Sequence, residues 1–221
     1  MFKWPPYRRP FFCAQESISC FRSAHTTLDE DGFERILMKT LTRGYVIVFE
    51  GGEGAGKGTQ IERLVAYLND RYGEGSSVVT HEPGGGFPDI RERIFQLDKS
   101  LPDLAERELA LFEEDRRAHC QNCIIPAVRS GKVVILDRFY QSTISYQGYA
   151  RGMNLEHIRE ANRQATEGVE EDLIVLLDVD PRIGLNRKYT NQPDKLNRFE
   201  REGYGCHEKV RLGYHAQASQ D

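Results

Sequence analysis

Four short runs rich in apolar and β-branched residues recur along the chain, separated by longer segments with helical periodicity. The runs cover residues 45–49, 77–81, 133–138 and 173–180. After the first run, apolar residues repeat at the spacing of one helix face, which predicts a helix from Lys57 to near Gly73. Strands that alternate with helices predict an α/β fold, with a parallel sheet covered by helices on both faces.

Further helical segments follow the same pattern. They are a short basic helix with Arg91 and Arg93, a long helical region 104–129 with a break near Pro126, a helix at 155–167, a helix that begins at Pro181, and a last helix at about 200–216. Residues 187–198 are polar and basic and lose the helical periodicity, so we expect a mobile loop there.

The first 42 residues differ from the rest of the chain. Pro5, Pro6 and Pro10 interrupt any early helix, and no periodic pattern begins before Thr42. We therefore expect a poorly ordered extension followed by one domain at 43–221. Up to Thr27 the extension is basic and weakly similar to an organelle transit peptide, although the amphipathic helix of such peptides is not evident in the sequence. An alternative is that the natural chain begins at Met38.

Composition limits the possible partners and compartments. The 221 residues carry a net charge of −4 with both signs mixed along the chain, which argues against a general nucleic-acid-binding surface. No run is long enough to span a membrane, so a soluble protein is expected, and the cysteine usage favours a reducing compartment and thus a cytoplasmic location. Five cysteines, an odd number, argue against a disulfide framework. Cys120 and Cys123 form a C-x-x-C within a predicted helix, where core packing is favoured over redox or zinc chemistry.

A glycine-rich turn after the first strand carries the strongest chemical signal. Gly51, four further residues, Gly56 and Lys57 give the spacing of a P-loop, in which backbone N–H groups surround the phosphates of a nucleotide. The predicted ATP-binding residues are Gly51, Gly52, Glu53, Gly54, Ala55, Gly56, Lys57, Gly58 and Thr59. Gly58 occupies the place of the usual Ser or Thr. A turn without a ligand is the alternative, and the glycine spacing disfavours a dinucleotide-binding loop.

Asp137 ends the buried strand 133–138. A carboxylate at the carboxyl end of a parallel strand, next to a P-loop, is typical of a Mg²⁺-organising residue. The alternative is a cap for the next helix. We expect Asp137 to hold Mg²⁺ through water.

Several motifs in order resemble the thymidylate kinase family of P-loop nucleoside-monophosphate kinases. They are FEGGEGAGKGTQ, HEPGG, LALFEEDRRAH, LDRFYQSTISYQG, LLDVDP and NRFEREG, between about Gly44 and Tyr214. The resemblance implies a three-layer α/β/α fold and transfer of a phosphoryl group from ATP to dTMP, giving ADP and dTDP for dTTP biosynthesis. It also implies Mg²⁺ as cofactor and a homodimer.

The resemblance assigns roles residue by residue. Glu53 matches the acid that meets the sugar 3′-hydroxyl, Phe112 the aromatic that stacks on thymine, and Arg116 the arginine that bonds the base. Arg138 matches the arginine that grips the substrate phosphate. The other implied substrate-binding residues are Pro83 after a cis bond, Arg91 or Arg93, Ser142, Thr143, Tyr146 and Gln147.

The P-loop has no arginine, so the resemblance places a catalytic cation in the lid at about 187–198. The candidates are Arg187, Lys188, Lys195 and Arg198, of which Arg187 and Lys188, with Lys57 and Arg138, form the expected catalytic set. Two motif positions depart from the family, with Asn197 for Asp and Gly86 for Thr.

The chain stops at Asp221 directly after a helix, whereas the family continues with a last strand and helix. We therefore expect the sheet to have an open edge and ATP binding to be weak. Two alternative functions stay open. One is another nucleoside-monophosphate kinase, because GKGTQ is typical of adenylate kinases. The other is a nucleotide-binding paralogue with little turnover. A regulatory GTPase is disfavoured because no N-K-x-D motif is present.

Overall fold

Five parallel strands form one sheet in the computed structural model, which describes residues 11–15, 44–98, 100–191 and 197–219. The strands are β1 (Phe11–Gln15), β2 (Tyr45–Gly51), β3 (Ser77–His81), β4 (Val133–Asp137) and β5 (Leu173–Asp178). Their order across the sheet is β1-β5-β2-β4-β3, so β2 lies at the centre. The four strands expected from the sequence are confirmed, as is the α/β fold with a parallel sheet.

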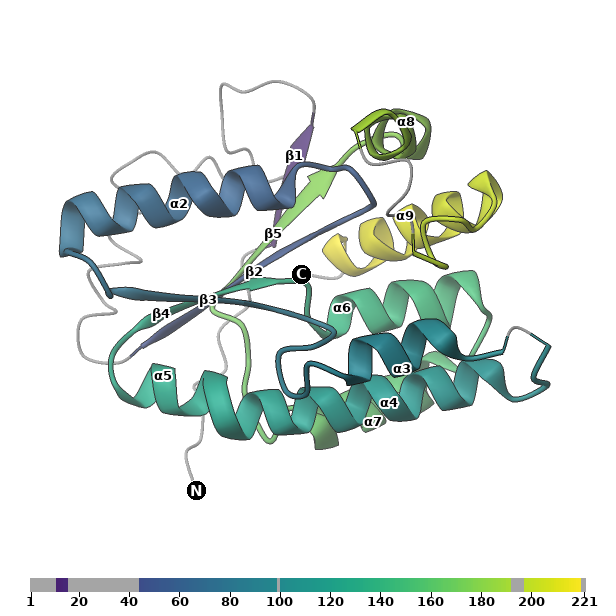
Figure 1. Ribbon diagram of the computed structural model, residues 1–221, viewed down its shortest axis with the longest axis horizontal. Helices are drawn as coiled ribbons and strands as arrows, with labels where there is room; N and C mark the ends of the chain where they lie inside the picture. The colour runs from purple at the N-terminus through teal and green to yellow at the C-terminus, as the bar shows by residue number, and fades with distance from the viewer. Residues whose placement is uncertain (1–10, 16–43, 99, 192–196, 220–221) are drawn as a thin grey trace.

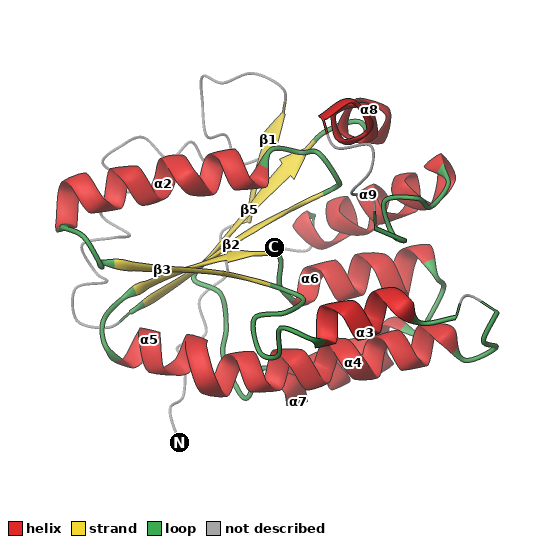
Figure 2. Ribbon diagram, in the orientation of Figure 1, coloured by secondary structure: helices red, strands yellow, loops and turns green. Residues whose placement is uncertain are grey.

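Helices cover both faces of this sheet (Figures 1 and 2). They are α2 (Lys57–Tyr72), α3 (Ile90–Gln96), α4 (Leu104–His119), α5 (Ile125–Arg129), α6 (Tyr140–Thr143), α7 (Leu155–Ala165), α8 (Pro181–Asn191) and α9 (Tyr204–Ala218), with π-helical turns η2 (Cys120–Ile124) and η3 (Ile144–Ala150). In Figure 1, α2 lies on one side of the strands, and α4, α5 and α7 lie on the other.

The central strand β2 explains why two helical layers are needed. Its side chains point alternately to the two faces, as in any strand. Ile47 and Phe49 pack in the core beneath α2, whereas Val46 and Val48 pack against η2 and α5. All four are fully or almost fully buried. The continuous apolar run in the sequence is therefore the signature of a strand covered on both sides.

The predicted long helix over 104–129 does not break at Pro126. Instead, α4, η2 and α5 follow one another without a gap. Proline cannot donate a backbone hydrogen bond and its ring crowds the preceding turn. A wider π-helical turn directly before Pro126 fits this constraint, and the helical run continues to Arg129.

Residues 11–15 correct the expectation that no element forms before Thr42. They make β1, which pairs in parallel with β5 from Phe11 opposite Ile174 to Gln15 opposite Asp178. An open edge of the sheet was expected, but the edge of β5 is covered by β1. The rest of the expected extension lies outside the described residues.

We expect β1 to protect the edge of β5. Alternate N–H groups of a strand point to the same neighbour, so prolines at both Cys13 and Ala14 remove at least one ladder donor. The double proline variant should lose about 2 kcal/mol of unfolding free energy in urea and should scatter more light through edge association. Threonine at the same two positions keeps both N–H groups and is the matched control. Equal unfolding of the two variants would contradict this role.

The lid expected as a loop at 187–198 is partly helical. Helix α8 continues to Asn191, residues 192–196 lie outside the described part, and α9 begins at Tyr204 rather than near residue 200. Residues 140–150 also form helical turns that the sequence pattern did not predict. Among the residues that the structure describes, no helix has the length and apolar character needed to cross a membrane.

Candidate active site

A cavity of about 740 Å³ lies where the carboxyl ends of the strands meet the P-loop and α4. Its walls include residues 53–59 of the P-loop, which lead into the first turn of α2. Backbone N–H groups at the start of a helix have no partners within the helix and carry partial positive charge. The loop and α2 therefore give this end of the cavity the chemistry of a phosphate site.

Lys57 lies at the base of this loop. Its ammonium donates to the carbonyl oxygens of Gly51 and Gly52, both at 3.3 Å, and lies 3.9 Å from Oδ1 of Asp137. Burial lowers the pKa of Lys57, and the charge of Arg138 lowers it further. Gly51 and Gly52 are not among the residues that line this cavity, and their carbonyl oxygens hold the Lys57 ammonium.

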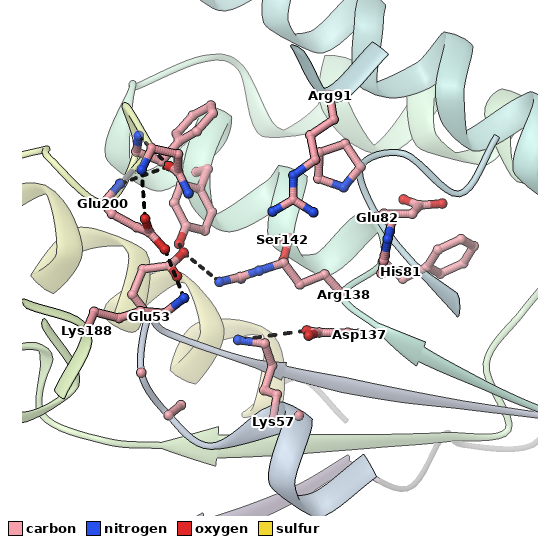
Figure 3. A pocket seen from close by; sticks show the side chains of 18 of the residues that line it. Glu53, Lys57, His81, Glu82, Arg91, Asp137, Arg138, Ser142, Lys188 and Glu200 are labelled. Atoms are coloured by element: carbon pink, nitrogen blue, oxygen red, sulfur yellow. Dashed lines mark hydrogen bonds and ion pairs between the residues drawn. The ribbon is translucent and has the colours of Figure 1, made fainter. Parts of the chain in front are cut away.

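Arg138 is the central cation of the cavity (Figure 3). Its backbone has φ = 73°, a left-handed conformation that residues other than glycine rarely adopt and that often marks a functional site. Nη1 donates to Ser142 Oγ at 3.1 Å and to the Tyr214 hydroxyl at 2.9 Å, and Nη2 donates to Glu53 at 2.8 Å. Two of its five N–H donors, on Nε and Nη2, have no partner within the described residues.

One oxygen of the Glu53 carboxylate receives two hydrogen bonds. Oε1 accepts from Arg138 and, at 3.0 Å, from the hydroxyl of Tyr146. Burial acts to raise the pKa of Glu53, but the charges of Arg138, Lys57 and Lys188 outweigh it and bring the pKa to about 2. Beneath this pair, burial raises the pKa of Glu50, whose carboxylate accepts from Phe139 N and the Ser142 hydroxyl.

The lowered pKa of Glu53 predicts an acid-sensitive contribution to folding. A carboxyl whose pKa falls from 4.5 to about 2 on folding stabilises the protein above pH 4.5, and this contribution is lost as the pH drops from 4.5 toward 2. We expect the unfolding free energy of the native chain to fall over this range by about 3 kcal/mol more than that of Glu53→Gln. Urea unfolding at several pH values measures the difference. Parallel curves for the two proteins would contradict it.

Helix α4 supplies the opposite wall. Phe112 and Arg116 both line the cavity, as their spacing of one helical turn predicted. Arg116 is 1% exposed and donates to Glu82, Thr143 and Asn162, which leaves one N–H of Nη1 without a partner in the described structure. The ring of Phe112 lies 6.3 Å from that of Phe199, a residue that sequence reasoning had not placed in the site.

The turn after β3 is anchored to α4 by Asp115. Its buried carboxylate accepts from the backbone N–H groups of Gly84, Gly86 and Phe87 at 2.7–3.0 Å. A Cβ on Gly86 would lie 2.2 Å from the carbonyl oxygen of Asp115, so glycine fits this local packing where the motif has threonine. The Glu82–Pro83 bond is cis, as the resemblance implied.

The structure distinguishes Arg91 from Arg93, between which the sequence could not choose. Arg91 lines the cavity and points into it in Figure 3. Arg93 is outside the lining and forms a surface ion pair with Glu114 at 3.7 Å. Pro83, Ser142, Thr143, Tyr146 and Gln147 all line the cavity, as expected.

Two of the four predicted lid cations face the cavity. Arg187 donates to the carbonyl of Gly54 at 3.3 Å, and Lys188 pairs with Glu200 at 3.0 Å. Arg198 does not line the cavity but is buried against Glu108, which corrects its candidacy as the catalytic cation. Lys195 lies outside the described residues.

Backbone packing and a local cap hold the lid elements. A Cβ on Gly54 would lie 2.0 Å from the carbonyl oxygen of Gly184, so α8 and the P-loop touch through backbone atoms. Asn197, the motif departure, accepts from the backbone N–H groups of Phe199 and Glu200 through its side-chain oxygen. An asparagine thus supplies the acceptor that an aspartate would supply in this turn.

Comparisons with known proteins agree with this arrangement. The family model described as thymidylate kinase matches residues 49–221. The thymidylate kinase of Desulfovibrio desulfuricans is 43% identical over 181 residues, which cover 79% of this chain and 82% of that protein. For that of Maridesulfovibrio salexigens the identity is 44% over 176 residues, covering 76% and 79%. The crystal structure of thymidylate kinase from Ehrlichia chaffeensis matches with a TM-score of 0.65 and 31% identity, covering 80% of this chain and 82% of that one. The chain therefore belongs to the thymidylate kinase family.

Proposed function

We propose that the cavity holds dTMP against α4 and ATP against the P-loop, so that the chain carries out the ATP-dependent phosphorylation of dTMP that its family indicates. One observation carries this assignment: the P-loop, Arg138 and the Phe112–Arg116 pair all line the same cavity. A phosphate donor and a flat, polar acceptor can therefore lie side by side in one cavity.

The acceptor side has a group for each part of a nucleotide. Phe112 offers a ring face to the base, and the remaining N–H of Arg116 can bond one carbonyl of it. Glu53 can accept from a sugar hydroxyl. Arg91 and the unpaired donors of Arg138 bind the phosphate, since a guanidinium contacts two phosphate oxygens at once.

The donor side combines Lys57, the N-terminus of α2 and Arg187. Lys57 and the N–H groups of residues 53–59 hold the phosphates of ATP. Arg187 reaches over the loop to Gly54, where it can neutralise charge on the transferred group. We assign it as the catalytic lid cation because Lys188 is already paired with Glu200.

Asp137 fits a role in holding Mg²⁺. Its Oδ1 is buried without a hydrogen-bond partner among the described residues, although it lies at the end of β4 beside Lys57. An unsatisfied carboxylate oxygen next to a phosphate site matches the oxygen ligands that Mg²⁺ prefers. When bound, Mg²⁺ neutralises phosphate charge. Gly58 leaves open space where a hydroxyl ligand usually lies, so the metal would depend on Asp137 and water.

The transfer needs no base from the protein. An oxygen of the dTMP phosphate is already anionic and attacks the γ-phosphorus of ATP, while the bond from that phosphorus to the bridging oxygen breaks and ADP leaves. The products are ADP and dTDP. The chain's part is to align the two phosphates and to balance their charge with Lys57, Arg138 and Arg187.

A coupled assay with ATP and dTMP, dUMP, AMP, CMP or GMP tests the proposal, with Lys57→Ala as the inactive control. We expect dTMP to be the preferred acceptor. Preference for AMP would support a different nucleoside-monophosphate kinase, and no transfer to any acceptor would support a nucleotide-binding protein without turnover.

The homodimer and the cytoplasmic location stay predictions. Analytical ultracentrifugation of the full chain tests the first, and imaging of a tagged chain in its own cell tests the second.

A further inference from the structure

Gln147 lies beside the part of the cavity that we propose binds the base, and the hydrogen bonding of its side-chain amide is unusual. It lines the cavity together with Phe112 and Arg116, yet its side chain is fully buried. Nε2 donates to Glu108 at 2.8 Å, whereas Oε1 has no hydrogen-bond partner within the described residues. A buried carbonyl oxygen without a partner is costly, and native structures usually give such an atom a ligand or water.

Glu108 determines which end of this amide faces the cavity. It lies on α4, is fully buried and is not among the residues that line the cavity. Its carboxylate also accepts from Arg151 Nε at 2.6 Å and from Arg198. A carboxylate that receives two guanidinium donors has only acceptor atoms to offer, so Gln147 must turn its NH₂ group toward it. The oxygen of Gln147 is then the end left for the cavity.

This polarity favours one class of base. An acceptor beside Phe112 and Arg116 suits a pyrimidine with a ring N–H, as thymine and uracil have at N3. Cytosine has a lone pair at N3, which would face the oxygen of Gln147 without a hydrogen bond. A site with a buried polar group discriminates strongly against an analogue that leaves it unpaired.

We propose that Glu108 is a positioning residue that fixes the orientation of Gln147 and thereby selects acceptor bases with an N3–H. The inference rests on the proposed placement of dTMP against α4. It differs from a structural role for Glu108 because it predicts a change in base preference rather than only a loss of stability.

The ratio of kcat/KM for dUMP to that for dCMP tests the proposal, because these substrates differ only in the 4-substituent and in N3. In Glu108→Gln the new amide can donate to Gln147, so the Gln147 side chain can present its NH₂ group to the cavity. We expect the ratio to fall at least about tenfold. Glu108→Asp keeps a carboxylate and should retain most of the preference even if it melts earlier.

Two further variants distinguish recognition of the base by Gln147 from a general effect of the charges around Glu108. Arg151→Gln removes one of the ion pairs of Glu108 but not its bond to Gln147, so the ratio should stay near that of the native chain. If Arg151→Gln lowers the ratio as much as Glu108→Gln does, the proposal is wrong. Gln147→Met removes the acceptor and leaves Glu108 with both arginines. This variant should also lower the dUMP-to-dCMP ratio, and it tests the proposal even if Glu108→Gln does not fold.

The outcomes also distinguish this inference from the proposed function. A native chain that phosphorylates dTMP, with an unchanged ratio in folded Glu108→Gln and Gln147→Met, would overturn the inference alone. A native chain without dTMP kinase activity would overturn the proposed function.

Discussion

Arg187→Ala is expected to lower kcat about a thousandfold, with a much smaller change in the KM for ATP. Its guanidinium donates to the carbonyl of Gly54 in the P-loop, next to the place that we propose for the transferred phosphoryl group. Arginines in this role contribute mainly to the transition state, and their loss costs about 10³–10⁵ in kcat. Steady-state kinetics with saturating dTMP and varied ATP measures both constants.

Lys188→Ala is the matched control because it removes the neighbouring cation of the same helix. Lys188 is held by Glu200, so its loss should cost about tenfold or less in kcat. If Lys188→Ala proves the more damaging change, the two roles are reversed. Equal and small effects would move the catalytic cation into the part of the lid at 192–196.

Arg138→Lys should lower kcat/KM for dTMP about a hundredfold or more. A lysine has one compact ammonium and cannot bind two phosphate oxygens while it also reaches Ser142, Tyr214 and Glu53. The effect should be confined to substrates with a phosphate. Calorimetric titration with thymidine, which lacks one, should show an affinity within about threefold of that of the native chain.

Arg93→Ala tests whether any arginine near the site has this effect. Arg93 pairs with Glu114 at the surface, where ion pairs contribute little, so kcat/KM should be nearly unchanged.

An equal loss of thymidine and dTMP affinity in Arg138→Lys would show that the variant damages the whole cavity and would contradict the assignment to the phosphate.

The fold could be predicted where one segment carries its own signal. The strand 45–49 is apolar at every position, and Lys57 to Gly73 repeats every three to four residues, so each element could be read locally. β1 could not, because its partner β5 lies more than 150 residues later and the pairing depends on an otherwise open edge. Helix α8 runs past the end of its periodic pattern, to Asn191. Its close contact through Gly184 is a tertiary constraint that periodicity does not record.

The residues of the candidate site likewise fall into those that the sequence could predict and those that it could not. Lys57 and Asp137 follow from motif and position, and Phe112 and Arg138 from the resemblance. The sequence carried no signal for the buried polar and charged residues that hold these groups, because their hydrogen-bond partners are distant in sequence. Glu108 meets Arg198 ninety residues away, Asp115 anchors a turn about thirty residues earlier, and Tyr214 reaches Arg138 across seventy-six.

The contact between Gly54 and Gly184 joins α8 and the P-loop directly through their backbone atoms. Each glycine would place a Cβ only 2.0 Å from a carbonyl oxygen of the other segment, so no side chain can stand between them. One methyl group at either position would therefore push α8, with Arg187, away from the P-loop and from the proposed phosphate site. The spacing between α8 and the P-loop is thus set by two backbones in direct contact, so any side chain larger than hydrogen at Gly54 or Gly184 must displace one of them.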